Sequence, residues 1–318
     1  MAYGKLTKLA NSLRRRGRSE WWPLPPPSKF RGVIMANDKV KEIVTERIIR
    51  FIEENDKLPW SMGFNTAPPQ SYVRKNHYHG TNYILTIMRG FSSPYWFTFK
   101  DVQKIEGRIR KGEAGTIVVY YNIREFEKKD PLTGETYLEQ IPFMRYYRVW
   151  NLEQLEPGHG IDENVPVVRE SAEAIVAACA PTLTFGKKPH YVPGTDSIGI
   201  PPIERYGDSD RYYEALFHEL VHWTGHKSRC NREMKPHSMD RGSYALEELV
   251  AEIGCAMLCH LCGIPVTENQ AAYVKGWLEA LNNDKGMIVT AASRAQKAVD
   301  FIMSLAKPDV EVVEEVES

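Results

Sequence analysis

Two histidines and a glutamate in the second half of the chain have the spacing of a catalytic zinc site. The segment reads His218-Glu219-Leu220-Val221-His222. On a helix, residues i and i+4 lie one turn apart on one face, so both imidazoles can bind a single metal ion. The intervening glutamate then faces the open side of the metal, where it can take a proton from a bound water. The pattern therefore predicts His218 and His222 as ligands and Glu219 as general base; the alternative is two unrelated helix histidines.

A catalytic zinc site needs a third protein ligand, and water takes the fourth position. Four downstream residues are candidates: His226, Glu247, Glu248 and Glu252. His226 lies beyond the expected end of the first helix, so we do not expect it on the ligand face. Glu248 and Glu252 are one turn apart on an expected helix over 243–262, so Glu248 can bind the metal while Glu252 orients a ligating histidine. Glu247 points about 100° away from Glu248, where a solvated acidic face is the alternative, and we expect it to contribute little.

The expected reaction is peptide hydrolysis, in which a water activated by a metal and a glutamate attacks an amide carbonyl. Glu219 would then pass the proton to the leaving amine. The candidates for stabilising the oxyanion are Tyr191, Tyr244 and His237, and the sequence does not choose among them. Zinc is the expected ion and manganese the alternative. A third histidine of the metzincin type is excluded, because Ser228 stands at its position.

Length and composition indicate a globular protein of two domains. The chain has 318 residues, a formal net charge of zero and five cysteines, which we interpret as free thiols in a reducing cytoplasm. Basic residues dominate the first 36 positions, and residues 309–317 are acidic; both ends are typical of solvated tails. There is no run of about 18 apolar residues and no signal peptide. We therefore expect a cytoplasmic protein without a membrane partner.

Apolar periodicity and turn residues predict an α+β fold in five segments. These are a basic, disordered leader over 1–36, a first domain over 37–152, a linker over 153–168, a second domain over 169–305 and an acidic tail over 306–318.

The two domains are expected to differ in architecture. In the first, segments 116–126 and 137–150 are rich in β-branched and aromatic residues and flank a turn-forming sequence, which predicts an antiparallel sheet. The second is predicted to be mainly helical, with helices over 209–225, 243–262, 267–282 and 287–305. The short segment 198–201 is expected to be an edge strand that flanks the metal cleft and pairs with an extended substrate.

Cationic and aromatic residues alternate between positions 72 and 111. Cations track a phosphate backbone, and aromatic faces stack on unpaired bases. Aromatic residues are also the usual core of a domain this size, so composition leaves both interpretations open. If the segment binds single-stranded DNA, the expected contacts are Arg74, Lys75, Tyr78, Trp96, Lys100, Lys104, Arg108, Arg110 and Lys111.

Several motifs occur in the order found in one known family. In the first half they are Leu58-Pro59-Trp60, Tyr78-His79-Gly80-Thr81-Asn82, Trp96-Phe97-Thr98-Phe99-Lys100, Arg110-Lys111-Gly112-Glu113 and the segment 149–154. In the second half they are His190-Tyr191-Val192-Pro193 with Asp196, and the segments 218–226 and 244–252. On these motifs, residues 37–305 resemble the ArdC-type antirestriction proteins of plasmids and phages, whose N-terminal domain is shared with TraC-type plasmid primases. Thr81 departs from the small aliphatic residue or isoleucine of many relatives, and the basic leader lies outside the resemblance.

The resemblance implies a single-stranded-DNA-binding domain joined to a zincin-like metallopeptidase domain that acts against host restriction during DNA entry. It also implies a metal site at His218, Glu219, His222 and the region of Glu248. The expected partners are single-stranded DNA and a host restriction enzyme or other protein substrate.

Two alternatives stay open. One is a non-enzymatic single-stranded-DNA-binding protein with a structural metal, which a fourth protein ligand such as His226 would favour. The other is a primase accessory protein, against which the scattered acidic residues of the first domain argue.

Overall fold

The computed structural model describes residues 28–62, 67–130, 133–158, 161, 169–232, 240–267 and 271–306, with the backbone alone for 28–36, 124, 142, 271 and 272. The described residues from 37 onward form one compact unit. Of the predicted disordered leader over 1–36, residues 28–36 instead belong to the helix Ser28–Asn55. Residues 1–27, the segment 233–239 with His237 and the acidic tail from residue 307 lie outside the described residues.

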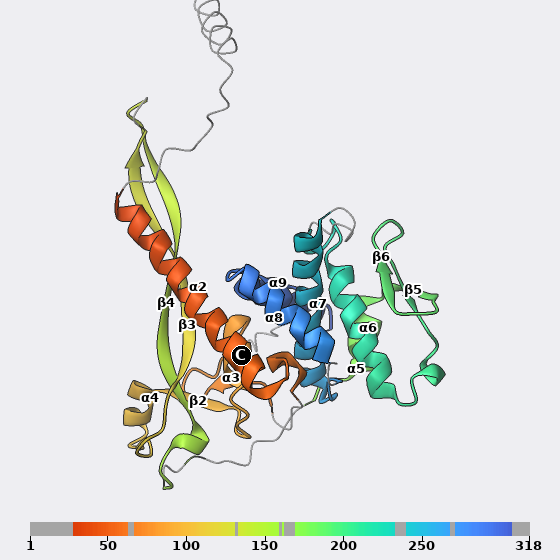
Figure 1. Ribbon diagram of the computed structural model, residues 1–318, viewed down its shortest axis with the longest axis horizontal. Coiled ribbons are helices and arrows are strands. Elements are labelled where there is room, and N and C mark those ends of the chain that lie inside the picture. Colours follow the sequence, from red (N-terminus) through yellow and green to blue (C-terminus); the bar gives the residue numbers. More distant parts are fainter. Residues whose placement is uncertain are drawn as a thin grey trace, which may run out of the picture. The chain divides into compact units, whose positions relative to one another are not determined.

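The first half combines helices with a four-stranded sheet (Figure 1). Its elements are α2 (Ser28–Asn55), η1 (Pro59–Ser61), β1 (Gln70–Ser71), α3 (Thr81–Ile87), β2 (Tyr95–Thr98), α4 (Phe99–Lys104), β3 (Thr116–Lys129), β4 (Thr136–Asn151) and η2 (Leu152–Gln154). The strand order is β1-β2-β4-β3. β3 and β4 form a long antiparallel hairpin over the two segments predicted as strands, β4 pairs with β2 antiparallel, and β1 with β2 parallel.

Short polar motifs fix the ends of these elements. Thr98 and Asp101 form a capping box at the start of α4, and Asn151 and Gln154 do the same for η2; both satisfy backbone N–H groups that lack helical partners. The Asn82 amide pairs with the backbone of Val119, donating to its carbonyl at 2.8 Å and accepting from its N–H at 2.6 Å. Because β3 is the outer strand of the sheet, this side chain covers part of an open edge and holds α3 against it.

The second half is mainly helical with a small sheet. Its elements are α5 (Ala172–Cys179), β5 (Thr182–Phe185), β6 (His190–Val192), β7 (Ser197–Ile200), η3 (Ile203–Arg205), α6 (Ser209–Thr224), α7 (Arg241–Cys262), α8 (Ala271–Asn283) and α9 (Met287–Ala306). The chain is thus mixed α and β, as predicted. No helix in the described part of the chain is long and apolar enough to cross a membrane.

The strand order of the small sheet corrects one prediction. The order is β5-β7-β6, so residues 198–200 of the segment 198–201, predicted at the edge, belong to the central strand β7. All four residues of β7 are buried, as a strand paired on both sides requires. Gly199 lies under the ring of His190, where a Cβ atom would come within 2.3 Å of that ring. Both β7 and β6 contact the helix Ser209–Thr224, and of these two strands β6 is the one at the edge of the sheet.

One buried hydrophobic cluster joins residues from both halves of the chain, and α7 runs through it. Its members include Val44 and Ile48 of α2, Leu220 of α6, and Leu249 and Ile253 of α7. The hydroxyl of Tyr83 in α3 lies 3.0 Å from Nδ1 of His260 in α7, and both side chains are buried. The helix that contributes the glutamates of the candidate site is therefore anchored in a core shared by α2, α3, α6 and α9.

Candidate metal centre and sheet surface

Helix α6 places the two motif histidines on one face. Asp208 caps its first turn by accepting from the N–H of Arg211 at 2.8 Å. The rings of His218 and His222 lie one turn apart with centroids separated by 4.9 Å. Leu216, Phe217, Leu220 and Val221 are buried on the other faces, so packing fixes the rotation of the helix and points both imidazoles at α7.

Helix α7 brings Glu248 to both histidines. It begins at Arg241, two residues before the predicted start, where Asp240 accepts from the N–H groups of Gly242 and Ser243. Glu248 Oε2 lies 3.6 Å from His218 Nε2, and its Oε1 lies 3.6 Å from His222 Nε2.

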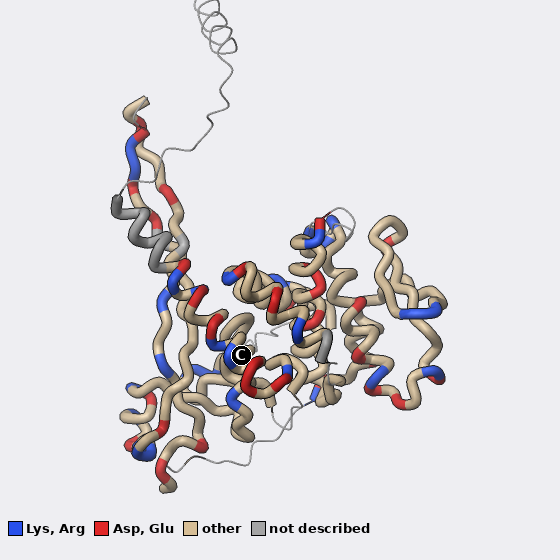
Figure 2. Tube along the Cα trace, viewed as in Figure 1, with Lys and Arg blue, Asp and Glu red and all other residues tan. Residues whose placement is uncertain are grey.

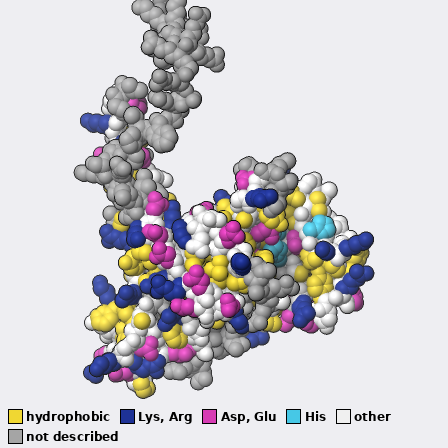
Figure 3. All heavy atoms as spheres, in the orientation of Figure 1, with side chains coloured by type: hydrophobic (Ala, Val, Ile, Leu, Met, Phe, Trp, Pro, Cys, Tyr) yellow, Lys and Arg dark blue, Asp and Glu magenta, His cyan; other side chains and the backbone are white. Residues whose placement is uncertain are grey.

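The spacing of these atoms fits a metal ion. One ligand atom from each of His218, His222 and Glu248 lies within 4.8 Å of the others. Metal–nitrogen and metal–oxygen bonds of about 2.0–2.2 Å place tetrahedral ligand atoms about 3.3–3.6 Å apart. Two imidazoles and a carboxylate are also the donor set of hydrolytic zinc enzymes. In Figure 3, histidine side chains lie beside acidic side chains in the region of α6 and α7.

Glu247 is a buried partner of His222. Its side chain is 8% exposed, and its Oε1 lies 3.2 Å from His222 Nδ1. Arg232 donates to both carboxylate oxygens, from Nε at 3.0 Å and from Nη2 at 2.7 Å. Burial raises the pKa of Glu247, but the hydrogen bonds from His222 and Arg232 lower it by more, so the net shift is downward. The solvated acidic face considered for Glu247 is therefore wrong.

His218 has a second carboxylate on its other nitrogen. Glu252 Oε1 lies 4.0 Å from His218 Nδ1 and accepts from the Tyr273 hydroxyl at 2.5 Å. Burial lowers the pKa of His218, but the hydrogen bond to Glu248 and the charges of Glu252 and Glu219 raise it by more, to about 9. Such a concentration of negative charge around two imidazoles favours a bound cation.

Glu219 faces the same cavity as the cluster. This cavity of about 440 Å³ is lined by Pro189, His190, Tyr191, Pro193, His218, Glu219, His222, Tyr244, Glu247 and Glu248. The edge strand β6 therefore forms one wall, α6 the floor and α7 the other wall. The candidate base, the three candidate ligands and the edge strand β6 therefore border one cavity.

The oxyanion candidates differ in what their polar atoms contact. The Tyr191 hydroxyl donates to Asp196 at 2.8 Å, and Arg229 also donates to that carboxylate, which holds the pKa of Asp196 below its usual range. Tyr244 precedes Glu248 by one helical turn and lines the cavity; burial and the charge of Glu248 raise its pKa. His237 lies outside the described residues.

His226 is not part of the cluster. Its Nδ1 lies 2.8 Å from the hydroxyl of Ser228 and 3.9 Å from Asp196. The prediction that it leaves the ligand face after the end of α6 is consistent with this position.

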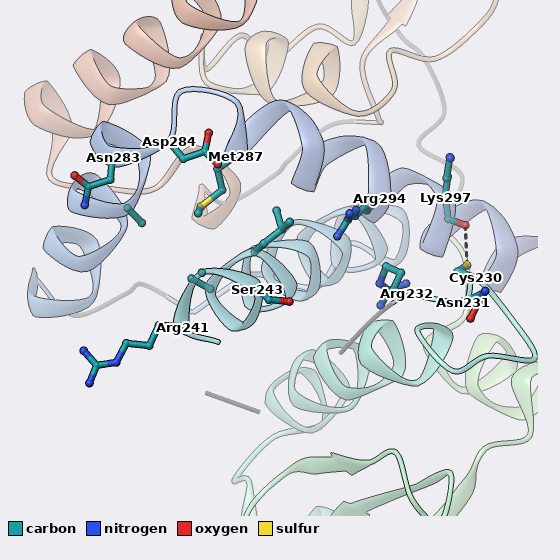
Figure 4. Close-up of a pocket in the computed structure, with 14 residues that line it drawn as sticks. Cys230, Asn231, Arg232, Arg241, Ser243, Asn283, Asp284, Met287, Arg294 and Lys297 are labelled. Carbon is teal, nitrogen blue, oxygen red and sulfur yellow. Dashed lines mark hydrogen bonds between the residues drawn. The ribbon is translucent and has the colours of Figure 1, made fainter. Parts of the chain in front are cut away.

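A larger cavity lies on the opposite side of the first turns of α7. It has a volume of about 850 Å³, and its cationic lining residues are Arg232, Arg241, Arg294 and Lys297. Figure 4 shows Arg294 and Lys297 on α9, with Arg232 beside them. None of the three candidate ligands lines this cavity, but Arg232 connects its wall to Glu247.

The structure separates the predicted DNA contacts into surface and core residues. Trp96 is 2% exposed and packs with Val118 and Val149, so its ring has no face for a base. Tyr78 is partly buried against the same cluster. The predicted cations are exposed on the surface: Arg74, Lys75, Lys100, Lys104, Arg108, Arg110 and Lys111. Lys and Arg recur around α4 and along the β3–β4 hairpin (Figure 2).

The hairpin adds an aromatic surface that the sequence reasoning missed. Residues opposite one another in an antiparallel pair point to the same face. Tyr120 pairs with Arg145 and Val118 with Tyr147, so Tyr120, Arg145 and Tyr147 share the face of Trp96 and Tyr78. Tyr120 is 48% and Tyr147 36% exposed. We call Tyr78, Tyr120, Phe143, Arg145 and Tyr147 the aromatic sheet face; the Arg145 guanidinium lies 4.7 Å above the Phe143 ring.

Two family models match the two halves of the chain. Residues 170–294 match the family described as zincin-like metallopeptidase, and residues 38–150 match the N-terminal domain of anti-restriction factor ArdC. The His-His-Glu cluster lies within the first of these ranges. The fold and the site thus define a protein with an ArdC N-terminal domain followed by a zincin-like metallopeptidase domain.

Two crystal structures of the antirestriction protein ArdC from plasmid R388 are similar to the chain. The metal-free structure is 35% identical with a TM-score of 0.67, covering 84% of this chain and 97% of that one. The Mn(II)-bound structure is 33% identical with a TM-score of 0.68, covering 85% and 98%. The chain belongs to the ArdC family of antirestriction proteins.

A curated relative is much longer. The DNA primase TraC of Escherichia coli is 32% identical over 293 residues, which are 85% of this chain, and the chain spans 27% of the length of that primase.

Proposed function

We propose that the protein binds single-stranded DNA and uses a metal-dependent peptidase site to protect incoming plasmid or phage DNA from host restriction. The observation that supports the peptidase most directly is the convergence of His218, His222 and Glu248 on one point, with Glu219 in the same cavity. Belonging to the ArdC family supports the antirestriction role.

The candidate ligands are His218, His222 and Glu248, and zinc or manganese is the expected ion. The solved R388 relative binds Mn(II). When bound, the ion would polarise a water and a substrate carbonyl as a Lewis acid. Glu247 and Glu252 would hold the two imidazoles so that each Nε2 faces the cluster.

The remaining steps use side chains of the cavity. Glu219 accepts the proton of the attacking water and returns it to the leaving amine. Tyr191 and Tyr244 both line the cavity as candidate oxyanion donors; the Tyr191 hydroxyl bonds Asp196, and the Tyr244 hydroxyl bonds Glu248. An extended substrate would add to the open edge of β6, whose N–H and C=O groups fix its register. Tyr191, bonded to Asp196, stiffens that strand.

The first half is proposed to bind the DNA through the aromatic sheet face and the cations around it. Tyr120 and Tyr147 offer partly exposed rings to bases, and Arg145, which pairs with Tyr120, lies on the same face. Stacking on rings is tolerant of sequence, and phosphate contacts add affinity that depends on salt. The expected ligand is therefore single-stranded DNA of any sequence.

Both alternatives fit the described residues less well. A structural metal would be closed by a fourth protein ligand, and His226 bonds Ser228 instead. A primase accessory role would draw on the similarity to TraC, but primase chemistry needs clustered acids for magnesium. Within the described residues, the group found able to hold a metal is the cluster on α6 and α7, and none is found in the first half.

The proposal is tested with purified protein loaded with zinc or manganese. Restriction endonuclease subunits and an unstructured protein such as casein are incubated with the wild type and with Glu219→Gln, and cleavage is followed by mass spectrometry. Cleavage by the wild type alone supports a peptidase. Intact substrates with both proteins, together with full metal occupancy, would favour the structural-metal alternative.

A further inference from the structure

A second cavity adjoins the candidate metal centre on the side of the first turns of α6. It has a volume of about 510 Å³ and lies between α6, α7 and the loop that follows α7. Pro189, His218 and Glu219 line both this cavity and the one at the cluster. A chain bound over the cluster could therefore place one side chain in this second space, which we call the side pocket.

The charges on the walls of the side pocket are mostly negative. Glu214, Glu219 and Glu252 line it, against the guanidinium of Arg211 and the imidazole of His218. Arg211 is 67% exposed, and its Nε lies 3.6 Å from Asp208, a carboxylate outside the pocket. Arg211 therefore neutralises little of the charge within.

The hydrogen-bond donors to these carboxylates are neutral. Glu214 accepts from the N–H of Thr267 at 2.7 Å and from its hydroxyl at 2.5 Å. Glu252 accepts from the Tyr273 hydroxyl. Such bonds hold the carboxylates in place, and because the donors are neutral they leave the net negative charge for a cation to balance.

One buried hydroxyl in the side pocket has no partner. The Tyr206 hydroxyl is inaccessible to solvent and forms no hydrogen bond with the described residues. An unsatisfied buried polar group costs about 1–3 kcal/mol, which a ligand atom would recover. Pro189, Ala215 and Val266 supply apolar wall, suited to the methylene stem of a long side chain whose charged end reaches the acids.

We propose that the side pocket receives the side chain of a lysine or arginine from a bound polypeptide. The stem would lie along the apolar wall, and the cationic end would pair with Glu214 and Glu252 and bond the Tyr206 hydroxyl. This inference rests on the proposed peptidase function and names its substrate class: chains with a basic residue next to the bond held at the cluster.

Binding of small capped amino acids tests the side pocket without any hydrolysis. The probes are the N-acetyl amides of arginine, lysine, norleucine and glutamine, titrated by calorimetry into metal-loaded protein. The arginine and lysine derivatives are expected to bind at least about tenfold more tightly than the two neutral ones, since one ion pair contributes about 1.4 kcal/mol or more in a partly enclosed site. Equal affinity of the norleucine and arginine derivatives would overturn the proposal.

Substitutions of opposite sign separate charge from folding. Glu214→Gln keeps an acceptor for Thr267 and should weaken arginine-amide binding about tenfold, whereas Arg211→Gln should strengthen it several-fold. Unfolding can lower the affinity but cannot raise it. A gain of affinity in Arg211→Gln would therefore show that the charge of the pocket, and not the stability of the fold, controls binding. Glu204→Gln, on the exposed turn η3, is the matched control and should leave binding unchanged. Unchanged affinity in both Glu214→Gln and Arg211→Gln would also overturn the proposal.

The side pocket and the peptidase can fail separately. If the arginine derivative binds as expected but no peptide is ever cleaved, the result supports the assignment of the side pocket and contradicts the peptidase function. The opposite outcome is that peptides are cleaved by the wild type and not by Glu219→Gln, but without preference for lysine or arginine. That result supports the peptidase function and contradicts the assignment of the side pocket.

Discussion

Glu247 and His222 form a buried hydrogen-bonded pair that joins helix α6 to α7, with Oε1 3.2 Å from Nδ1. Arg232 also donates hydrogen bonds to the Glu247 carboxylate. Its Nη1 donates to the Thr224 hydroxyl and its Nη2 to the Val221 carbonyl, each at 2.7 Å. Arg232 thus connects the last turn of α6 to Glu247. His222 can present only Nε2 to the cluster while this arrangement holds.

Removing Glu247 is expected to weaken metal binding although Glu247 is not a ligand. Glu247→Ala frees the imidazole of His222 and should lower zinc affinity about 10- to 100-fold. It also leaves Arg232 buried without its carboxylate, at a cost of about 3–5 kcal/mol in stability. Competition with a chromophoric chelator measures the affinity, and thermal melting of the metal-free protein measures the stability. Glu279→Ala, on the exposed face of α8, is the control.

Glu247→Gln refines this prediction. The amide keeps an acceptor for Arg232 and nearly the same volume, so it should retain more stability than the alanine variant. An affinity for zinc equal to wild type in both Glu247 variants would show that His222 needs no carboxylate partner.

Replacement of Glu248 is expected to remove most of the metal affinity. Glu248 is the carboxylate that lies 3.6 Å from both Nε2 atoms, so Glu248→Ala leaves two ligands. Glu252→Ala should cost about 10- to 100-fold, because Glu252 only orients His218, and His226→Ala should cost nothing. Metal stoichiometry of the three dialysed variants decides the assignment. Tight zinc binding by Glu248→Ala with loss in His226→Ala would reverse it.

The sequence predicted the centre of this site because its geometry is local. A spacing of four residues on a helix places two imidazoles on one face, whatever the rest of the fold does. Glu248 followed from a second helical pattern with the apolar stripe of Leu249, Val250 and Ile253. Its neighbour Glu247 was misjudged, since its partner Arg232 lies in an irregular segment after α6 without a periodic pattern. The packing of α6 against α7 decides which side of α7 contacts the segment that contains Arg232, and this packing is a tertiary property.

The order of the strands and the burial of Trp96 also could not be predicted from the sequence. The segment that forms β7 predicted a strand, but its central place depends on pairing with β5 and β6, which is a tertiary property. Trp96 belonged to a cationic and aromatic segment, yet it packs in the core with Val118. Tyr120 and Tyr147 lie outside that segment, in the strands of the hairpin, where alternation could have placed them on one face.

Glu219→Gln is expected to separate metal binding from hydrolysis. The substitution removes the base but not a ligand, so the metal content should stay near wild type while cleavage of any substrate falls by a factor of at least about 10²–10⁴, the usual contribution of a general base. Atomic emission gives the metal content, and single-turnover cleavage gives the rate. Loss of metal in Glu219→Gln would mean that Glu219 is itself a ligand.

The buried contact between Tyr83 and His260 is expected to stabilise the packing of α3 on α7. Tyr83→Phe removes a hydroxyl that lies 3.0 Å from His260 Nδ1 and should lower the free energy of unfolding by about 1–2 kcal/mol. Chemical denaturation followed by circular dichroism measures it. Tyr137→Phe, at an exposed position of β4, is the control and should change the stability by less than about 0.5 kcal/mol. An equal effect of the two substitutions would contradict a role for this contact.

The aromatic sheet face is expected to bind single-stranded DNA more tightly than duplex DNA. Neighbouring residues of β3 give a matched pair: Tyr120 points to this face, whereas Tyr121 points to the opposite one, and they are 48% and 58% exposed. Base stacking contributes about 1–3 kcal/mol per base, so Tyr120→Ala should lower the affinity about 5- to 150-fold and Tyr121→Ala should leave it nearly unchanged. Fluorescence anisotropy with a labelled oligonucleotide at several salt concentrations measures both.

Arg145→Gln should flatten the salt dependence of DNA binding, because it removes a phosphate contact. Trp96→Ala removes a core side chain and should lower stability, so its loss of binding would say nothing about stacking. Equal effects of Tyr120→Ala and Tyr121→Ala, or equal affinity for duplex DNA, would exclude this face as the binding surface.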